Sequence, residues 1–180
     1  MTINVYIDNN VWNFLFDRKL DLAIELPRDE YCLFLTREVE FEIPPIPAEK
    51  VELKAFIEKT IKDCSIETHS FFGFYDPRHP PDEQRVGGFN VGYWISKEEA
   101  AFIEQQMATM GIVKKQTTRL YKNEADISLA ARSFHSVVLS LNKKKGPLQD
   151  AYEQGGKVIF LTSFENSGMS LSDFIKANSP

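Results

Sequence analysis

The hydrophobic positions of this chain form short strand-like runs, each followed at once by a segment with helical spacing. Residues 3–7 and 31–35 are compact apolar runs rich in strand-forming side chains. Residues 11–16 follow the first run, and residues 37–43 follow the second and must end before Pro44. A strand that leads directly into a helix is the building unit of α/β proteins, so this pattern predicts an α/β opening.

Polar residues at the junctions predict where these helices begin. Asn9 and Asn10 are placed to cap the first helix, and Thr36 is placed to cap the second. Ser96 followed by Glu99 forms a capping box that opens a later helix.

The remaining elements follow from spacing and from turn residues. Apolar side chains at helical spacing predict a helix over residues 48–64 that is half exposed. Two aromatic runs joined by a proline-rich loop predict a hairpin or strand pair within residues 70–96. Further expected elements are a helix over 96–110, a helix over 124–141 and a last strand over 158–161. This order favours an α/β fold with a mainly parallel sheet covered on both faces.

Bulk composition narrows the class of protein. A length of 180 residues predicts one domain covering residues 1–180. The net charge of −5 gives no general attraction for nucleic acid, so RNA would need a local basic patch or bound metal. Cys32 and Cys64 lack metal-type spacing and are expected to be free thiols. The chain shows no leader and no apolar run of membrane-spanning length, so we expect a cytoplasmic protein without membrane contact.

Three acidic residues lie where the loops of a parallel sheet meet. Asp8 ends the first strand, Glu42 lies in the helix after the second, and Asp126 opens the helix at 124. Ligands of such sheets bind at the carboxyl ends of the strands, so these acids are expected to converge. Clustered carboxylates repel one another, and hard divalent cations such as Mg²⁺ or Mn²⁺ are their natural counterions. The sequence therefore predicts a magnesium or manganese site that activates water for phosphodiester attack.

The segments that carry these acids resemble the PIN-domain nucleases. VYIDNNVW is similar to the opening motif of that family, LTREVEFEI to the segment with its glutamate, and NEADISLAARSF to the segment with its third acid. The resemblance implies a three-layer α/β/α fold and an endoribonuclease that uses Mg²⁺ or Mn²⁺. By this match Asp8, Glu42 and Asp126 take the catalytic, metal-binding positions, and Asn9 takes a supporting one. Many members are toxins of bacterial toxin–antitoxin pairs, so an antitoxin partner is also implied.

The last strand departs from the family pattern. A threonine or serine and then an aspartate usually follow it, whereas here VIFLT leads into Ser163, Phe164, Glu165 and Asn166. Glu165 is placed to reach the site one residue late, or Ser163 and Asn166 are placed to hold a metal-bound water. A second reading therefore stands beside the nuclease: a degenerate PIN-like domain that binds RNA or a protein partner without catalysis.

Each acidic residue also has a possible structural role that involves no metal. Asp8 is placed to cap the following helix, and Asp126 to favour a helix dipole. Glu38, four residues before Glu42, reads as a solvated helix charge, whereas Glu42 lies between apolar neighbours.

Basic and aromatic residues supply the candidate contacts with RNA or with a partner. Arg119, Lys122 and Arg132 flank Asp126 and are expected to guide a backbone phosphate. The aromatic side chains of residues 70–96 are suited to stacking on bases. They are equally suited to a core or a homodimer interface.

Overall fold

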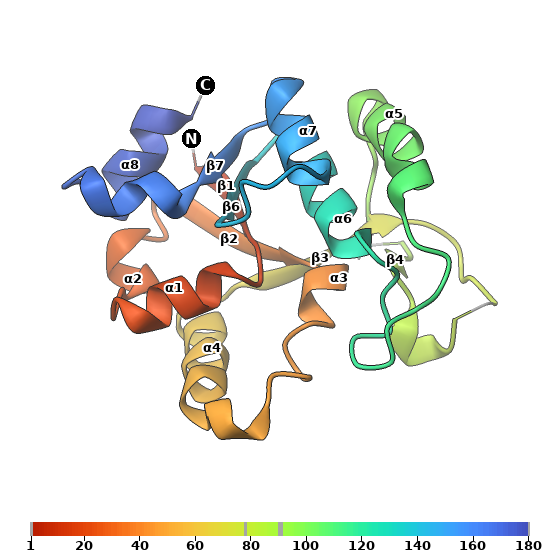
Figure 1. Cartoon of the computed structure of the whole chain (residues 1–180), viewed down its shortest axis with the longest axis horizontal. Coiled ribbons are helices and arrows are strands. Elements are labelled where there is room, and N and C mark those ends of the chain that lie inside the picture. The colour runs from red at the N-terminus through yellow and green to blue at the C-terminus, as the bar shows by residue number, and fades with distance from the viewer. Residues whose placement is uncertain (1, 78, 90–91, 180) are drawn as a thin grey trace.

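A mainly parallel sheet forms the centre of the molecule, as the computed structural model shows for residues 2–77, 79–89 and 92–179 (Figure 1). Its strands are β1 (Ile3–Ile7), β2 (Tyr31–Thr36), β3 (Glu67–Phe72), β4 (Val86–Gly87), β5 (Gly92–Tyr93), β6 (Val137–Ser140) and β7 (Val158–Phe160). Helices flank this sheet, so the predicted α/β class with a mainly parallel sheet is confirmed.

The strand order places β1 at the point where the chain changes direction across the sheet. The order is β4-β3-β2-β1-β6-β7, with β5 also paired to β3. Val5 of β1 is in register with Leu33 on one side and with Val137 on the other, and both pairings are parallel. The carboxyl ends of β1 and β6 therefore form the switch point where open α/β sheets bind their ligands.

Burial on both faces explains why the central strands read as continuous apolar runs. Val5, Ile7, Val138 and Leu139 are fully buried, and they belong to one hydrophobic cluster that reaches from β1 to the C-terminal helix. Burying one such side chain stabilises the fold by about 1.5–3 kcal/mol. The sheet is thus a rigid base for the loops at its carboxyl edge.

The helices form two groups, which Figure 1 shows on either side of the strands. The first group joins α1 (Val11–Asp17), α2 (Leu22–Glu25) and α4 (Val51–Asp63), and the second joins α5 (Lys97–Gln106), α6 (Glu124–Arg132) and α7 (Pro147–Glu153). The chain also contains α3 (Arg37–Glu40), α8 (Leu171–Asn178) and the short 3₁₀ helices η1 (Ala48–Lys50), η2 (Pro81–Glu83), η3 (Met107–Thr109) and η4 (Leu161–Asn166).

The helix predicted over residues 124–141 is wrong in its second half. Helix α6 ends at Arg132, and Val137–Ser140 forms the central strand β6 between β1 and β7. All four residues of β6 are buried, so the strand lacks the polar alternation that marks a half-exposed strand. Its apolar residues continued the helical spacing by coincidence.

The aromatic segment does not form an antiparallel hairpin. Strands β4 and β5 both pair with β3 in parallel, and each is only two residues long. Gly92 allows β5 to lie against this backbone, because a Cβ at that position would come within 2.6 Å of the Phe72 Cα atom. The first aromatic run contributes the end of β3 and the second contributes β5, so the predicted strand pair exists but is parallel.

Two helix starts were predicted correctly and one helix end was not. Thr36 accepts a hydrogen bond from the Val39 N–H at 3.3 Å, and Ser96 and Glu99 form the expected capping box. Helix α3, however, ends at Glu40, and Glu42 lies in the turn after it. Glu38 and Glu42 therefore do not share one helix face.

Candidate metal and active site

Asp8 lies at the carboxyl end of β1, where it is buried with only 5% of its surface exposed. The Ser140 hydroxyl donates a 2.6 Å hydrogen bond to its Oδ2 atom, and the side-chain amide of Asn10 donates to the same atom. Burial raises the pKa of Asp8 to about 6, while these two hydrogen bonds act in the opposite direction. The carboxyl group is held in one orientation and is poised to ionise near neutral pH.

Asn10 does not cap α1 with its side chain, contrary to expectation. Its Oδ1 atom accepts a 2.9 Å hydrogen bond from the Leu141 N–H, and its amide nitrogen donates to Asp8 and Ser140. Asn10 thus links the ends of β1 and β6. Its side chain serves the Asp8 site and leaves the helix start without a side-chain cap.

Glu42 and Asp126 reach the same region from two other elements. Burial, together with the negative charges of Asp8 and Asp126, raises the pKa of Glu42 to about 7. Burial also raises the pKa of Asp126, and the charge of Asp126 in turn raises that of Asp8. The three predicted acids are therefore coupled electrostatically at the switch point of the sheet.

Lys115 is a member of this site that the sequence reasoning missed. Its ammonium lowers the pKa of both Glu42 and Asp126, so it is the cation that partly offsets their repulsion. It lies in the exposed loop before α6, where Arg119 N–H donates to the Lys115 carbonyl at 2.8 Å. Nothing in the local sequence distinguishes this lysine from the neighbouring solvated ones.

The chemistry of this donor set suits a hard divalent cation, because three carboxyl groups are brought together with raised pKa values. Their placement is looser than a finished coordination sphere. Within residues 2–77, 79–89 and 92–179, no three histidine, cysteine, aspartate or glutamate side chains are arranged to hold a metal ion. Metal binding would therefore need these side chains to move closer together.

Glu38 is buried, although the sequence suggested a solvated charge. It is 7% exposed, and the Ser128 hydroxyl donates a 2.7 Å hydrogen bond to its Oε2 atom. Burial raises its pKa, whereas the Arg132 guanidinium lowers it. The bond ties α3 to α6, the helix that carries Asp126. The partner lies 90 positions away in the chain, so no local pattern could reveal it.

The turn after β7 does not bring a fourth acid to this cluster. Glu165 forms an ion pair with Arg18, and its side chain is 57% exposed. Ser163 and Asn166 are also exposed on the short helix η4. The Arg18 guanidinium in turn lies over the Phe14 ring at 4.0 Å, which holds Glu165 on the α1 side.

The three predicted phosphate contacts have different environments. Arg132 is 5% exposed and packs on the Phe71 ring at 3.7 Å, so its burial conflicts with a role in guiding RNA. Arg119 is exposed but is paired with Asp82 at 3.0 Å and with Glu83. Lys122 is exposed. It is the best placed of the three to meet a phosphate.

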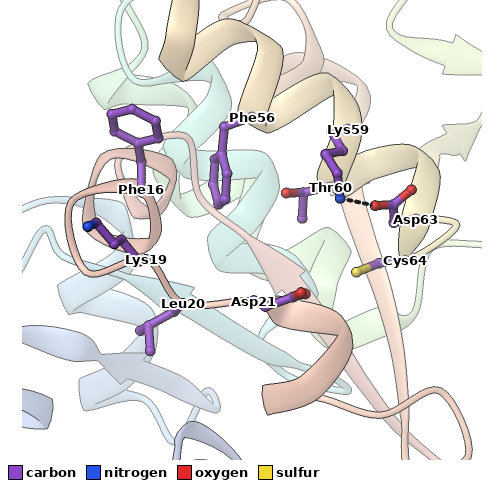
Figure 2. Close-up of a pocket in the computed structure, with 9 residues that line it drawn as sticks. All are labelled: Phe16, Lys19, Leu20, Asp21, Phe56, Lys59, Thr60, Asp63 and Cys64. Atoms are coloured by element: carbon purple, nitrogen blue, oxygen red, sulfur yellow. Dashed lines mark hydrogen bonds and ion pairs between the residues drawn. The ribbon is translucent and has the colours of Figure 1, made fainter.

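Helix α1 lines several cavities, among them one beside the acidic site and one between α1 and α4. The first, of about 240 Å³, is lined by Asn9 and Glu42 among others. The second, of about 250 Å³, lies between α1 and α4, where Phe16, Phe56 and Cys64 line it (Figure 2). None of the predicted site residues lines the second cavity. Burial raises the pKa of the Cys64 thiol in this second cavity. Cys32 and Cys64 are both free cysteines, as expected.

Comparison with known proteins finds no matching family model, no matching curated protein and no matching solved structure. Among the described residues, no helix is both long enough and apolar enough to cross a bilayer.

Proposed function

We propose that this protein is a ribonuclease of the PIN type that uses Mg²⁺ or Mn²⁺ to hydrolyse phosphodiester bonds. The observation that carries the proposal is the electrostatic coupling of Asp8, Glu42 and Asp126 at the switch point of the sheet. Buried carboxyl groups with raised pKa values that converge in this way are typical of functional sites, because burying unpaired carboxylates destabilises a fold.

Asp8, Glu42 and Asp126 are the residues that would hold the cation. When bound, the ion would activate a water molecule and neutralise charge on the phosphate. Asp8 needs a fixed orientation for this task, and the Ser140 hydroxyl and the Asn10 amide supply it. Lys115 would balance part of the negative charge of the cluster and draw a phosphate towards it.

The test is cleavage of a labelled single-stranded RNA with Mn²⁺, with EDTA and with Asp126→Asn. This substitution removes one charge and keeps the shape of the side chain, so the protein should fold. Losing a partner outside the metal shell typically costs about 10- to 100-fold in activity, so losing a ligand charge should cost at least about 100-fold. Cleavage that persists in EDTA or in Asp126→Asn would refute the proposal.

A second candidate is a PIN-like domain that binds RNA or a protein partner without catalysis. Two observations favour it: Glu165 is engaged by Arg18, and aromatic side chains are unusually exposed on the β3 side of the sheet. Phe74 is 82% and Trp94 is 76% exposed, and Trp94 stacks on Phe72 at 4.4 Å between ring centroids. Binding of RNA by the wild-type protein without any metal-dependent cleavage would favour this candidate over the nuclease.

A further inference from the structure

Arg85 links the edge of the sheet to the elements that carry the acidic site. It lies just before β4, and its side chain is only 12% exposed. Its Nε–H donates a 2.8 Å hydrogen bond to Oε1 of Glu124, which opens α6 two positions before Asp126. Its Nη2 atom donates a hydrogen bond to the Arg119 carbonyl, in the loop before that helix. One guanidinium group therefore holds both α6 and the loop that leads into it.

This loop carries Lys115, the residue whose positive charge acts on Glu42 and Asp126. The Lys115 N–H donates to the Leu120 carbonyl at 2.8 Å, and the Arg119 N–H donates to the Lys115 carbonyl at the same distance. The loop is therefore a closed turn, so a hydrogen bond to the Arg119 carbonyl also restrains the backbone of Lys115. Arg119 has a φ of 59°, a conformation that needs support from its surroundings in a residue with a side chain.

Other ion pairs tie the same two segments together, but they are more exposed. Arg119 pairs with Asp82 at 3.0 Å and with Glu83 at 3.3 Å, and the side chains of Arg119 and Asp82 are 56% and 70% exposed. Exposed ion pairs contribute little, whereas removing one partner of a buried pair leaves the other charge uncompensated. The position of the loop therefore depends mainly on Arg85 and its nearly buried partner Glu124.

Arg85 also reaches the turn that carries Glu42. Its guanidinium lies over the Phe41 ring at 5.1 Å, and Phe41 directly precedes Glu42 in the turn after α3. A single side chain thus contacts three elements, which carry Glu42, Lys115 and Asp126. These elements come from separate parts of the chain, so a contact with all three fixes their relative placement.

We propose that Arg85 is a positioning residue that holds Lys115 and the start of α6 in place for the acidic site. The idea rests on the proposed ribonuclease function and gives the segment before β4 a role in it. Lys115 would meet a phosphate while Asp126 holds the cation, and a misplacement of about 1 Å in such a site can cost about 100-fold in rate. The sequence could not reveal this role, because these two partners of Arg85 lie 34 and 39 positions away.

Hydrogen–deuterium exchange, followed by NMR spectroscopy, tests this role without any substrate. In Arg85→Gln the Lys115 and Arg119 amides should exchange at least about tenfold faster than in wild type, because a charged donor no longer restrains the turn. The Val138 amide donates to the Lys157 carbonyl at 2.9 Å beside the central sheet. Its exchange should stay at the wild-type rate, which verifies that the fold is intact.

A second variant covers the case in which Arg85→Gln does not fold. Arg85→Lys keeps a positive charge beside Glu124, but an ammonium lacks the planar fork that reaches Glu124 and the Arg119 carbonyl together. It should therefore fold and still loosen the turn, with faster exchange of the same two amides.

Arg37→Gln is the matched control. The Arg37 guanidinium also lies over the Phe41 ring, at 4.5 Å, and donates to the Asp82 carbonyl at 2.9 Å. Within the described residues it makes no hydrogen bond or ion pair with Glu124 or with residues 115–120. The two amides of the turn should therefore exchange in Arg37→Gln as they do in wild type.

A double-mutant cycle connects Arg85 with the proposed chemistry. Arg85→Gln and Lys115→Gln should each lower kcat/KM for Mn²⁺-dependent RNA cleavage by at least about tenfold. Because Arg85 acts through Lys115, the double variant should lose at least about threefold less than the product of the two single losses. If Arg85 served only general stability, the two losses would multiply.

The outcomes separate this proposal from the proposed function. Faster exchange of the two amides in Arg85→Gln, without RNA cleavage by the wild-type protein, would support the role of Arg85 and refute the nuclease. Unchanged exchange in both Arg85→Gln and Arg85→Lys would overturn the role of Arg85 and leave the nuclease standing. Cleavage losses that multiply, or exchange that is equally fast in Arg37→Gln, would also overturn it.

Discussion

The Ser140 hydroxyl donates a 2.6 Å hydrogen bond to Oδ2 of Asp8, although 132 positions separate the two residues in the chain. The contact exists because β1 and β6 are parallel neighbours, so their carboxyl ends meet at one edge. Ser140 is fully buried and also accepts a hydrogen bond from the Asn142 N–H at 2.9 Å. The pair fixes the orientation of the central carboxyl group of the site.

Replacing Ser140 by alanine should destabilise the protein at pH 8, where Asp8 is ionised. A hydrogen bond to a charged group contributes about 1.5–3 kcal/mol, and we expect a loss of that size. The pKa of Asp8 should also rise above its value of about 6, because the bond from Ser140 lowers it. Urea unfolding at pH 8 measures the first effect. Ser163→Ala is the control, since Ser163 is exposed. Equal stability of the two variants would contradict the expectation.

Mn²⁺ or Mg²⁺ should raise the thermal stability of the wild-type protein. A ligand that binds only the native state at a hundredfold excess over its Kd adds about 2.7 kcal/mol. Asp8→Asn should lose this gain, because it removes a proposed ligand charge. Differential scanning fluorimetry with and without the metal measures both. Asp29→Asn is a matched control on an exposed carboxylate and should respond like wild type. An equal shift in Asp8→Asn would place metal binding elsewhere.

Stability without metal should fall as the pH rises through neutrality. Asp8 and Glu42 have pKa values of about 6 and about 7, both raised above those of the unfolded chain. Between about pH 4 and pH 7 the native state thus binds more protons than the unfolded state. These two groups stabilise the native state fully at pH values below their pKa values in the unfolded chain. This stabilisation is lost as the pH rises through their pKa values in the folded protein.

Asp8→Asn isolates this effect from the buried histidines. The pKa values of His69 and His79 are lowered, so their contribution runs in the opposite direction. As the pH rises from about 4 to about 8, the free energy of unfolding of Asp8→Asn should increase by on the order of 3 kcal/mol relative to that of wild type. The reason is that the variant has no buried charge at this position. Urea unfolding of both proteins in EDTA across this range measures the difference. A difference that does not vary with pH would mean that Asp8 keeps an ordinary pKa.

The strands that were predicted most accurately are those in which the apolar run in the sequence coincides with the buried residues of the strand. Ile3–Ile7 was predicted without error, and the last strand was predicted to within one residue. The capping box of Ser96 and Glu99 was also predicted, because a cap depends only on residues three positions apart. These features need no knowledge of distant parts of the chain.

The residues that support the acidic site depend on tertiary contacts and escaped prediction. Ser140 lay inside a supposed helix, because a strand buried on both faces shows no alternation. The burial of Glu38 depends on Ser128, and that of Arg132 depends on rings from β1, β3 and β5. An acidic residue that comes directly after a strand can thus be identified from the sequence. The residues that contact it are determined by which strands are neighbours in the sheet.

Lys122 should contribute more to RNA affinity than Arg119. Each phosphate contact with single-stranded RNA changes the slope of log K against log salt by about 0.7. Lys122→Gln should reduce the slope by about this amount, provided that the protein binds RNA as proposed. Arg119→Gln should reduce it less, because Asp82 and Glu83 already pair with Arg119. Fluorescence anisotropy of labelled RNA in EDTA at several salt concentrations gives both slopes, and the reverse ranking would contradict this placement.

An aspartate at position 164 should not add a fourth metal ligand, even though the resemblance to PIN-domain nucleases points to this turn. The Phe164 ring packs against Phe14 and Phe174, with ring centroids 5.8 and 5.3 Å away. Phe164→Asp removes these contacts and places a charge beside the hydrophobic core, at a cost of about 3 kcal/mol or more. Glu165→Asp should cost no more than about 1 kcal/mol, because it alters only an exposed ion pair with Arg18.

Urea unfolding of the two variants, together with Mn²⁺-dependent RNA cleavage, tests this difference. We expect Phe164→Asp to be destabilised without any gain in cleavage, because the side chain faces Phe14 of α1 and Phe174 of α8 rather than Asp8. Glu165→Asp serves as the control for adding or moving an acid in this turn. If Phe164→Asp were as stable as wild type and cleaved RNA faster, the turn after β7 would have to rearrange towards the acidic site, and η4 would then be part of the metal centre.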